Sequence, residues 1–152
     1  MSKLDVMFSN NSDDWATPED IYNHFIKDLG CIDPCPLYSE FDNLNKVCVN
    51  SKIYINPPYS KIDKWVDFIH RNLINGCTIY LLIPSRTDTK YFHKLMGFDS
   101  VKSDLYFIKG RLKFGNSINS APFPSVLIKM KYTGYNSINS YFIERERVIK
   151  IE

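Results

Sequence analysis

The segment Asn56-Pro57-Pro58-Tyr59 constrains the fold of this chain more than any other part of the sequence. It follows a short apolar run, Ile53-Tyr54-Ile55, and it precedes an apolar pattern with helical spacing. Each proline lacks an amide hydrogen and has a fixed φ angle, so the pair ends the apolar run and stiffens the backbone. We therefore expect a strand to end at Asn56. In open α/β sheets, ligands bind at this end of a strand.

These four residues supply two hydrogen-bond acceptors beside an aromatic ring. The side-chain oxygen of Asn56 and a proline carbonyl can accept hydrogen bonds from one amino group, and Tyr59 offers a flat face beside them. Two such acceptors make an exocyclic amine, such as N6 of adenine, more nucleophilic and stabilise its developing positive charge. An aromatic ring can stack on a base that has left the helix. The segment predicts methyl transfer from S-adenosylmethionine without a metal, and its alternative is a rigid turn with no site.

Length and composition set wider limits. The chain has 152 residues, 44% of them hydrophobic, which is enough for one domain with a buried core. Its net charge of +2 does not decide for or against nucleic acid, so a binding patch must be local. The sequence has neither a long apolar run nor an apolar leader, so we expect no membrane span and a cytoplasmic location. The four cysteines do not form paired C-x-x-C sets, which favours reduced thiols over a zinc site.

Helical and strand patterns alternate along the chain. A helix is predicted from Thr17, a candidate capping residue, to Leu29, with Gly30 as the stop. Two further helices are predicted at 62–73 and 91–95. Strands are predicted at 31–33, 51–55, 78–83, 105–108 and 126–128. This order predicts an α/β fold with a mostly parallel sheet and an antiparallel edge. Residues 1–14 are expected to be flexible. Residues 132–152 are ambiguous, and within them Glu144-Arg145-Glu146-Arg147 could form either a solvated helix or an edge strand.

Other segments could contact a cofactor. Asp33, in Asp33-Pro34-Cys35-Pro36, could hold the amino group of a methionine moiety or ribose hydroxyls, or could form an Asx-type turn. Asp42 is a weaker candidate for the ribose diol, because acids in loops are usually solvated. Trp15-Ala16-Thr17-Pro18 could place backbone amides and an aromatic ring near the cofactor, or could cap a helix with Trp15 as its hydrophobic staple.

Basic residues follow several of the predicted strands. Arg86 follows the central strand and is a candidate contact to a phosphate or carboxylate. Lys109, Arg111 and Lys113 lie close in sequence to an aromatic residue, Phe114, and could touch a DNA backbone, or could form a charged surface hairpin. We add two residues that directly follow the Pro-Pro turn to the candidate nucleic-acid contacts: Ser60 and Lys61.

Six motifs occur in a fixed order over roughly residues 13–130. They are Trp15-x-Thr17-Pro18, Ile32-Asp33-Pro34-Cys35, Asn56-Pro57-Pro58-Tyr59-Ser60 with Trp65 beyond it, Leu82-x-Pro84-x-Arg86-Thr87-Asp88, Gly110-Arg111-Leu112-x-Phe114 and Pro122-Phe123-Pro124-Ser125. This series resembles the phage-type DNA N-6-adenine methyltransferase family, often called Dam-like. The order and spacing of the motifs carry the resemblance, and Asn-Pro-Pro-Tyr is its most specific member.

The resemblance implies a Rossmann-like methyltransferase fold in one catalytic domain, 1–152, with S-adenosylmethionine as cofactor. It also implies adenine in duplex DNA as acceptor, and a phage or prophage origin. Asn56 and the Pro57 carbonyl would hold the amino group, and Tyr59 would stack on the flipped adenine. Asp33 would sit at the cofactor, and Thr17 and Pro18 would line its methionine side. The F-x-G-x-G loop of other methyltransferases is absent, and Asp33-Pro34-Cys35-Pro36 takes its place.

Two other functions fit the same residues. One is a methyltransferase that acts on another amine, such as RNA adenine, cytosine N4 or glutamine. The other is a non-catalytic nucleic-acid-binding or protein-binding relative of the fold, which would not bind the cofactor. The sequence leaves open the recognition site, a monomer or homodimer state, and whether the modified DNA is protected in a restriction-modification setting.

Overall fold

The computed structural model describes residues 16–35, 44–45, 47–115 and 120–152. A five-stranded sheet with the order β1-β2-β4-β3-β5 forms its centre. The strands are β1 (Lys52–Ile55), β2 (Thr78–Pro84), β3 (Val101–Ile108), β4 (Ser125–Tyr132) and β5 (Ser137–Ile143). The pairs β1–β2 and β3–β5 are parallel, and β4 is antiparallel to both of its neighbours. Four strands therefore share one direction, and β4 alone is reversed.

The α/β class and the common direction of most strands are confirmed, but the predicted position of the antiparallel strand is wrong. β4 lies inside the sheet, between β2 and β3, whereas the edge beyond β3 is the parallel strand β5. β5 comes from the segment 132–152, which the sequence left ambiguous, and residues 145–147 belong to a 3-10 helix instead of an edge strand. The short connection 133–136 carries the chain past the start of β3, and this allows β5 to pair with the free side of that strand.

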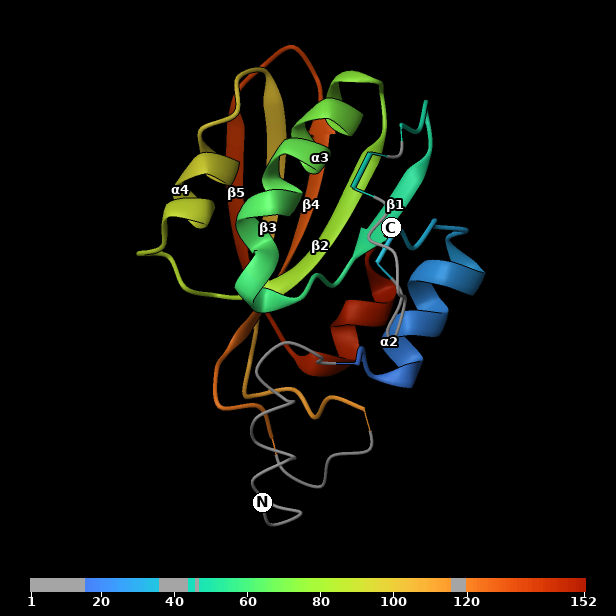
Figure 1. Cartoon of the computed structure of the whole chain (residues 1–152). Helices are drawn as coiled ribbons and strands as arrows, with labels where there is room; N and C mark the ends of the chain where they lie inside the picture. The colour runs from blue at the N-terminus through green and yellow to red at the C-terminus, as the bar shows by residue number, and fades with distance from the viewer. Residues whose placement is uncertain (1–15, 36–43, 46, 116–119) are drawn as a thin grey trace, which may run out of the picture.

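Helices cover both faces of the sheet (Figure 1). On one face lie η2 (Tyr59–Lys61), α3 (Ile62–Ile74) and α4 (Lys90–Met96). α3 packs there through a stripe of buried apolar residues at helical spacing, which includes Trp65 and Ile69. On the other face lie α2 (Glu19–Asn23), the π-helical turn η1 (His24–Asp28) and the 3-10 helix η3 (Arg145–Lys150). No helix within the described residues is long and apolar enough to cross a bilayer.

Two local predictions near the N-terminus need correction. Thr17 does not cap α2, which begins after Pro18 without a side-chain cap, because the Thr17 hydroxyl is engaged elsewhere. The predicted strand 31–33 is reduced to a single parallel bridge between Ile32 and Ile53. Pro34, which follows almost directly, has no amide hydrogen with which to extend the pairing. Gly30 ends the helical segment as predicted, with a φ of 71° that favours glycine.

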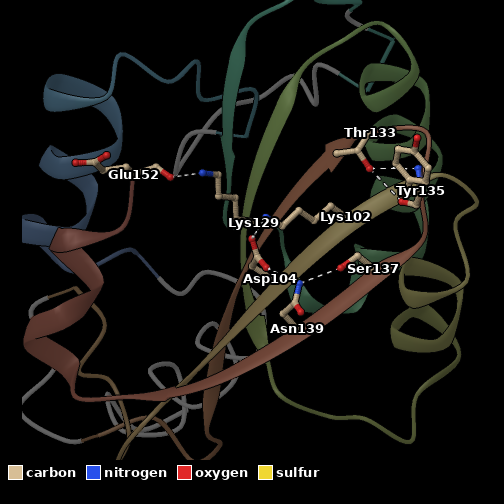
Figure 2. Close-up of polar contacts among 8 residues, drawn as sticks. All are labelled: Lys102, Asp104, Lys129, Thr133, Tyr135, Ser137, Asn139 and Glu152. Carbon is tan, nitrogen blue, oxygen red and sulfur yellow. Dashed lines mark hydrogen bonds and ion pairs between the residues drawn. The ribbon is translucent and has the colours of Figure 1, made fainter.

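Side chains fasten the C-terminal segment to the rest of the molecule. Asn139 on β5 donates from Nδ2 to Asp104 on β3 at 3.1 Å and to the Ser137 hydroxyl at 3.0 Å (Figure 2). Arg145 in η3 donates to both carboxylate oxygens of Asp20 in α2, at 2.5 and 2.7 Å. The chain beyond β4 is therefore tied both to the sheet and to the helices on one face.

Candidate functional site

The carboxyl ends of β1, β2, β3 and β5 lie at one edge of the sheet, at the bottom of Figure 1, together with the beginning of β4. Main-chain hydrogen bonds join the loops at this edge. Ser85 after β2 donates to the Pro124 carbonyl before β4 at 3.0 Å, and Lys109 after β3 donates to the Ile143 carbonyl of β5 at 2.9 Å. Strand ends that converge in this way form the ligand-binding edge of α/β proteins.

The side chain of Asn56, directly after β1, is held at both ends. Its Nδ2 donates to Oγ1 of Thr17 at 3.1 Å, and its Oδ1 accepts from the Tyr59 hydroxyl at 3.2 Å. Oγ1 of Thr17 also lies 2.7 Å from the hydroxyl of Tyr54, which is fully buried in β1. These contacts orient the Asn56 amide, with its nitrogen toward Thr17 and its oxygen toward Tyr59.

The Pro-Pro turn leads directly into a helix. Pro57 is buried, and the Pro58 carbonyl accepts a hydrogen bond from the Lys61 amide at 2.9 Å, which closes η2. The ring of Tyr59 is half-buried and packs edge-on against Phe123, with 5.2 Å between the ring centroids. Burial raises the pKa of the Tyr59 hydroxyl well above its usual value. Tyr59 therefore stays a neutral hydrogen-bond donor to Asn56 at physiological pH.

Asp33 lies beside this group of side chains. Its Oδ1 accepts from the Cys35 amide at 3.0 Å, which is the Asx-type turn that the sequence offered as one interpretation. The Tyr22 hydroxyl also hydrogen-bonds the carboxylate, and the Tyr22 ring lies edge-on to Tyr54 at 6.5 Å. Burial raises the pKa of Asp33, and the two hydrogen bonds oppose that rise. Asp33 is thus linked through two tyrosines to the residues that hold Asn56.

The chemistry of these residues fits S-adenosylmethionine. A partly buried carboxylate at Asp33 suits a cationic amino group or ribose hydroxyls, which would replace the hydration that burial removes. Of the other predicted cofactor contacts, Pro18 and Pro34 are buried and Cys35 is half-buried. Two further predicted cofactor contacts, Trp15 and Asp42, lie outside the described residues. The cofactor-binding role of the whole group stays a prediction.

The candidate nucleic-acid contacts are all exposed, and they follow strands or turns that end at this edge. They are Ser60, Lys61, Arg86, Lys109, Arg111 and Lys113. Lys109 forms an ion pair with Glu144 at 3.3 Å, so its ammonium group already has a carboxylate partner. Their contact with DNA remains a prediction.

Sequence reasoning missed the contributions of Tyr54 and Tyr22 to the site. A usable signal existed for Tyr54, because it lies two residues before Asn56 and alternate strand residues share a face. No local pattern points to Tyr22, which reaches Asp33 from helix α2. Phe123 and Phe114, whose ring centroids lie 6.0 Å apart, form the apolar side of the site. Both residues lie in segments that the sequence analysis noted only as motifs.

The mixed α/β sheet, with an oriented amide and a carboxylate at the carboxyl ends of its parallel strands, is consistent with a methyltransferase-like fold. A family model described as DNA N-6-adenine-methyltransferase (Dam) matches residues 6–126. Because the match spans more than half of the chain, the chain belongs to this family. Among curated proteins, no match is found.

Proposed function

We propose that this protein transfers a methyl group from S-adenosylmethionine to N6 of adenine in DNA. The observation that carries the proposal is the Asn56 amide, held by Thr17 and Tyr59 at the carboxyl end of β1. Membership of the DNA N-6-adenine-methyltransferase family supports adenine in DNA as the acceptor. We take residues 1–152 as one catalytic domain, to which β5 and η3 belong.

In this mechanism Asn56 and Pro57 bind the reacting amino group. Oδ1 of Asn56 and the Pro57 carbonyl accept hydrogen bonds from N6. An amide oxygen has two lone pairs, so Oδ1 can accept from N6 while it also accepts from Tyr59. As the N6 lone pair forms its bond to the methyl carbon, the bond from that carbon to the sulfonium sulfur would break and leave a neutral thioether. Positive charge develops on N6, and the two acceptors stabilise it. One proton of N6 then leaves to water.

The remaining residues hold the two substrates. The cofactor supplies a methyl group on a sulfonium, which needs no further activation. Asp33 would bind the amino group or the ribose of the cofactor, beside Thr17 and Pro18. The adenine leaves the duplex, and Tyr59, braced by Phe123, stacks on it. Basic residues at the same edge, such as Arg86 and Lys113, contact the DNA backbone.

The deciding experiment measures transfer of labelled methyl from S-adenosylmethionine to unmethylated duplex DNA, followed by nucleoside analysis. We expect N6-methyladenine from the wild-type protein and at least a ~100-fold lower rate from Asn56→Ala, because the bonds of Asn56 strengthen in the transition state. Asn45→Ala is the matched control, since Asn45 is exposed and is not among the residues that hold Asn56. Wild-type activity in Asn56→Ala would overturn the mechanism.

Acceptor competition separates the alternatives. The same reaction is offered three other acceptors: RNA, a DNA duplex analysed for N4-methylcytosine, and a peptide that contains glutamine. Label in any of these rather than in DNA adenine would replace the proposed substrate. If no acceptor takes label and calorimetry detects no binding of S-adenosylmethionine, the protein is a binding module and the proposal fails.

A further inference from the structure

Exposed apolar side chains gather along β5 and the turn before it. Of the eight large hydrophobic residues exposed in the described part of the chain, five lie between positions 132 and 142, so exposed apolar side chains are concentrated in this segment. They are Tyr132 (48% exposed), Tyr135 (79%), Ile138 (58%), Tyr141 (45%) and Phe142 (86%).

β5 is also an edge without the usual protection. It pairs with β3 on one side, and the order of the described strands ends with it. Soluble proteins protect such edges with charged residues, proline or bulges, because unpaired main-chain groups attract other strands. The sequence of β5, Ser-Ile-Asn-Ser-Tyr-Phe-Ile, has no charge, proline or glycine. An edge of this kind is suited to pairing.

The register shows which residues face outward. The Ile143 carbonyl accepts from Lys109, so Ile143 bonds toward β3. The N–H and C=O of one strand residue point to the same side, and the side alternates along the strand. Ile138, Ser140 and Phe142 therefore direct their main-chain groups away from β3, where a new strand would lie.

We propose that β5 pairs antiparallel with β5 of a second copy of this chain, about a two-fold axis at Ser140. Ser140 then faces the partner's Ser140, and Ile138 faces the partner's Phe142. These are the outward-facing residues, so each pair exchanges two main-chain hydrogen bonds. The Ile–Phe pairs join a β-branched and an aromatic side chain, which is a favourable cross-strand combination. No like charges oppose one another, since the strand carries none.

The exposed surface is large enough for a reversible dimer. An aromatic side chain can bury about 150–250 Å². The exposed fractions of Tyr135, Ile138, Tyr141 and Phe142 set an upper limit on the order of 500 Å² of buried side chain per copy, because strand pairing covers only part of each side chain. Two copies reach at most about 1,000 Å² before the backbone is counted, which is below the range of stable interfaces, so we expect a weak, reversible dimer. Because the strands run antiparallel, the two candidate sites would lie at opposite ends of the joined sheet.

Sedimentation velocity from roughly 1 to 100 µM tests the pairing, with wild type, Ile138→Lys and Ile74→Lys compared. Ile74 is the matched control, because it is also 58% exposed but lies at the end of α3. We expect wild type and Ile74→Lys to form dimers, and Ile138→Lys to remain a monomer with an unchanged far-UV spectrum. A monomeric wild type, larger open-ended oligomers, or a dimeric Ile138→Lys would each overturn the proposal.

Ser140→Cys tests the register in a protein that keeps Ile138, so the result does not depend on how Ile138→Lys affects folding. Facing residues in a hydrogen-bonded antiparallel pair have Cα atoms about 5.5 Å apart, within reach of a disulfide. Under mild oxidation we expect a covalent dimer from Ser140→Cys and none from wild type, whose four cysteines serve as the background. Equal cross-linking of the two proteins, or none in Ser140→Cys, would overturn the two-fold axis at Ser140. Neither test depends on the proposed enzymatic function.

Discussion

The Asn56 amide nitrogen donates a hydrogen bond to Oγ1 of Thr17 at 3.1 Å, across 39 positions of sequence. Thr17 lies just before α2, and Asn56 just after β1, so the contact joins a helix start to a strand end. It holds the amide oxygen on the side of Tyr59, where the mechanism needs an acceptor. This makes Thr17 a positioning residue for Asn56 as well as a candidate neighbour of the cofactor.

Thr17→Val tests this positioning role. Valine keeps the shape of threonine but cannot accept from Asn56, so the amide loses its orientation. We expect kcat for DNA methylation to fall about tenfold with a smaller change in KM, the effect of one lost hydrogen bond. Thr17→Ser keeps the hydroxyl and should restore most of the rate. Equal rates for Thr17→Val and Thr17→Ser would show that the hydroxyl does not position Asn56.

The same hydroxyl should matter for stability through Tyr54. Thr17→Val leaves the buried Tyr54 hydroxyl without this partner, and we expect a loss of about 1–3 kcal/mol in the free energy of unfolding. Adding Tyr54→Phe removes the orphaned hydroxyl, so the double variant should be less destabilised than the sum of the two single variants. Urea unfolding of the four proteins measures this coupling. Strict additivity would mean that the 2.7 Å contact contributes no stability.

Asp33 should make stability depend on pH in the direction opposite to most carboxylates. Its pKa is raised by burial, so the folded protein holds this proton more tightly than the unfolded chain. Its stabilising contribution is complete below the ordinary value of 3.8 and is lost as the pH rises through the folded pKa. Asp33→Asn should therefore match wild type at low pH and exceed its melting temperature at neutral pH. A lower melting temperature of Asp33→Asn at neutral pH would contradict the raised pKa.

The salt dependence of DNA binding should distinguish lysines at the candidate site from other surface lysines. Lys113 lies in the loop at the candidate site edge, whereas Lys131 lies near the far end of β4. If Lys113 contacts a phosphate, Lys113→Ala should reduce the slope of log K against log salt by about 1. Lys131→Ala is the control and should leave the slope unchanged. Fluorescence anisotropy with labelled duplex DNA measures both, and equal slopes in both variants would remove Lys113 from the DNA contacts.

Local sequence patterns predicted most of the elements but not their arrangement. The helix at 62–73 and the strand at 78–83 were correct to within a residue or so, because long apolar patterns report burial directly. The strand at 31–33 failed, since pairing there depends on what lies beside Ile32 rather than on its own propensity. β5 could not be predicted, because its alternation of exposed and half-buried residues arises only from its place at the edge.

The sequence by itself determined where the candidate site lies. Two prolines after an apolar run force a strand to end at Asn56, since they lack amide hydrogens and have fixed φ angles, and this constraint is local. Only the tertiary structure decided which side chains meet there. The Asn56 amide takes its orientation from Thr17, and Tyr22 reaches Asp33 from a helix. The reversed strand β4 inside the sheet and the open edge of β5 likewise depend on contacts between distant segments, which no local pattern encodes.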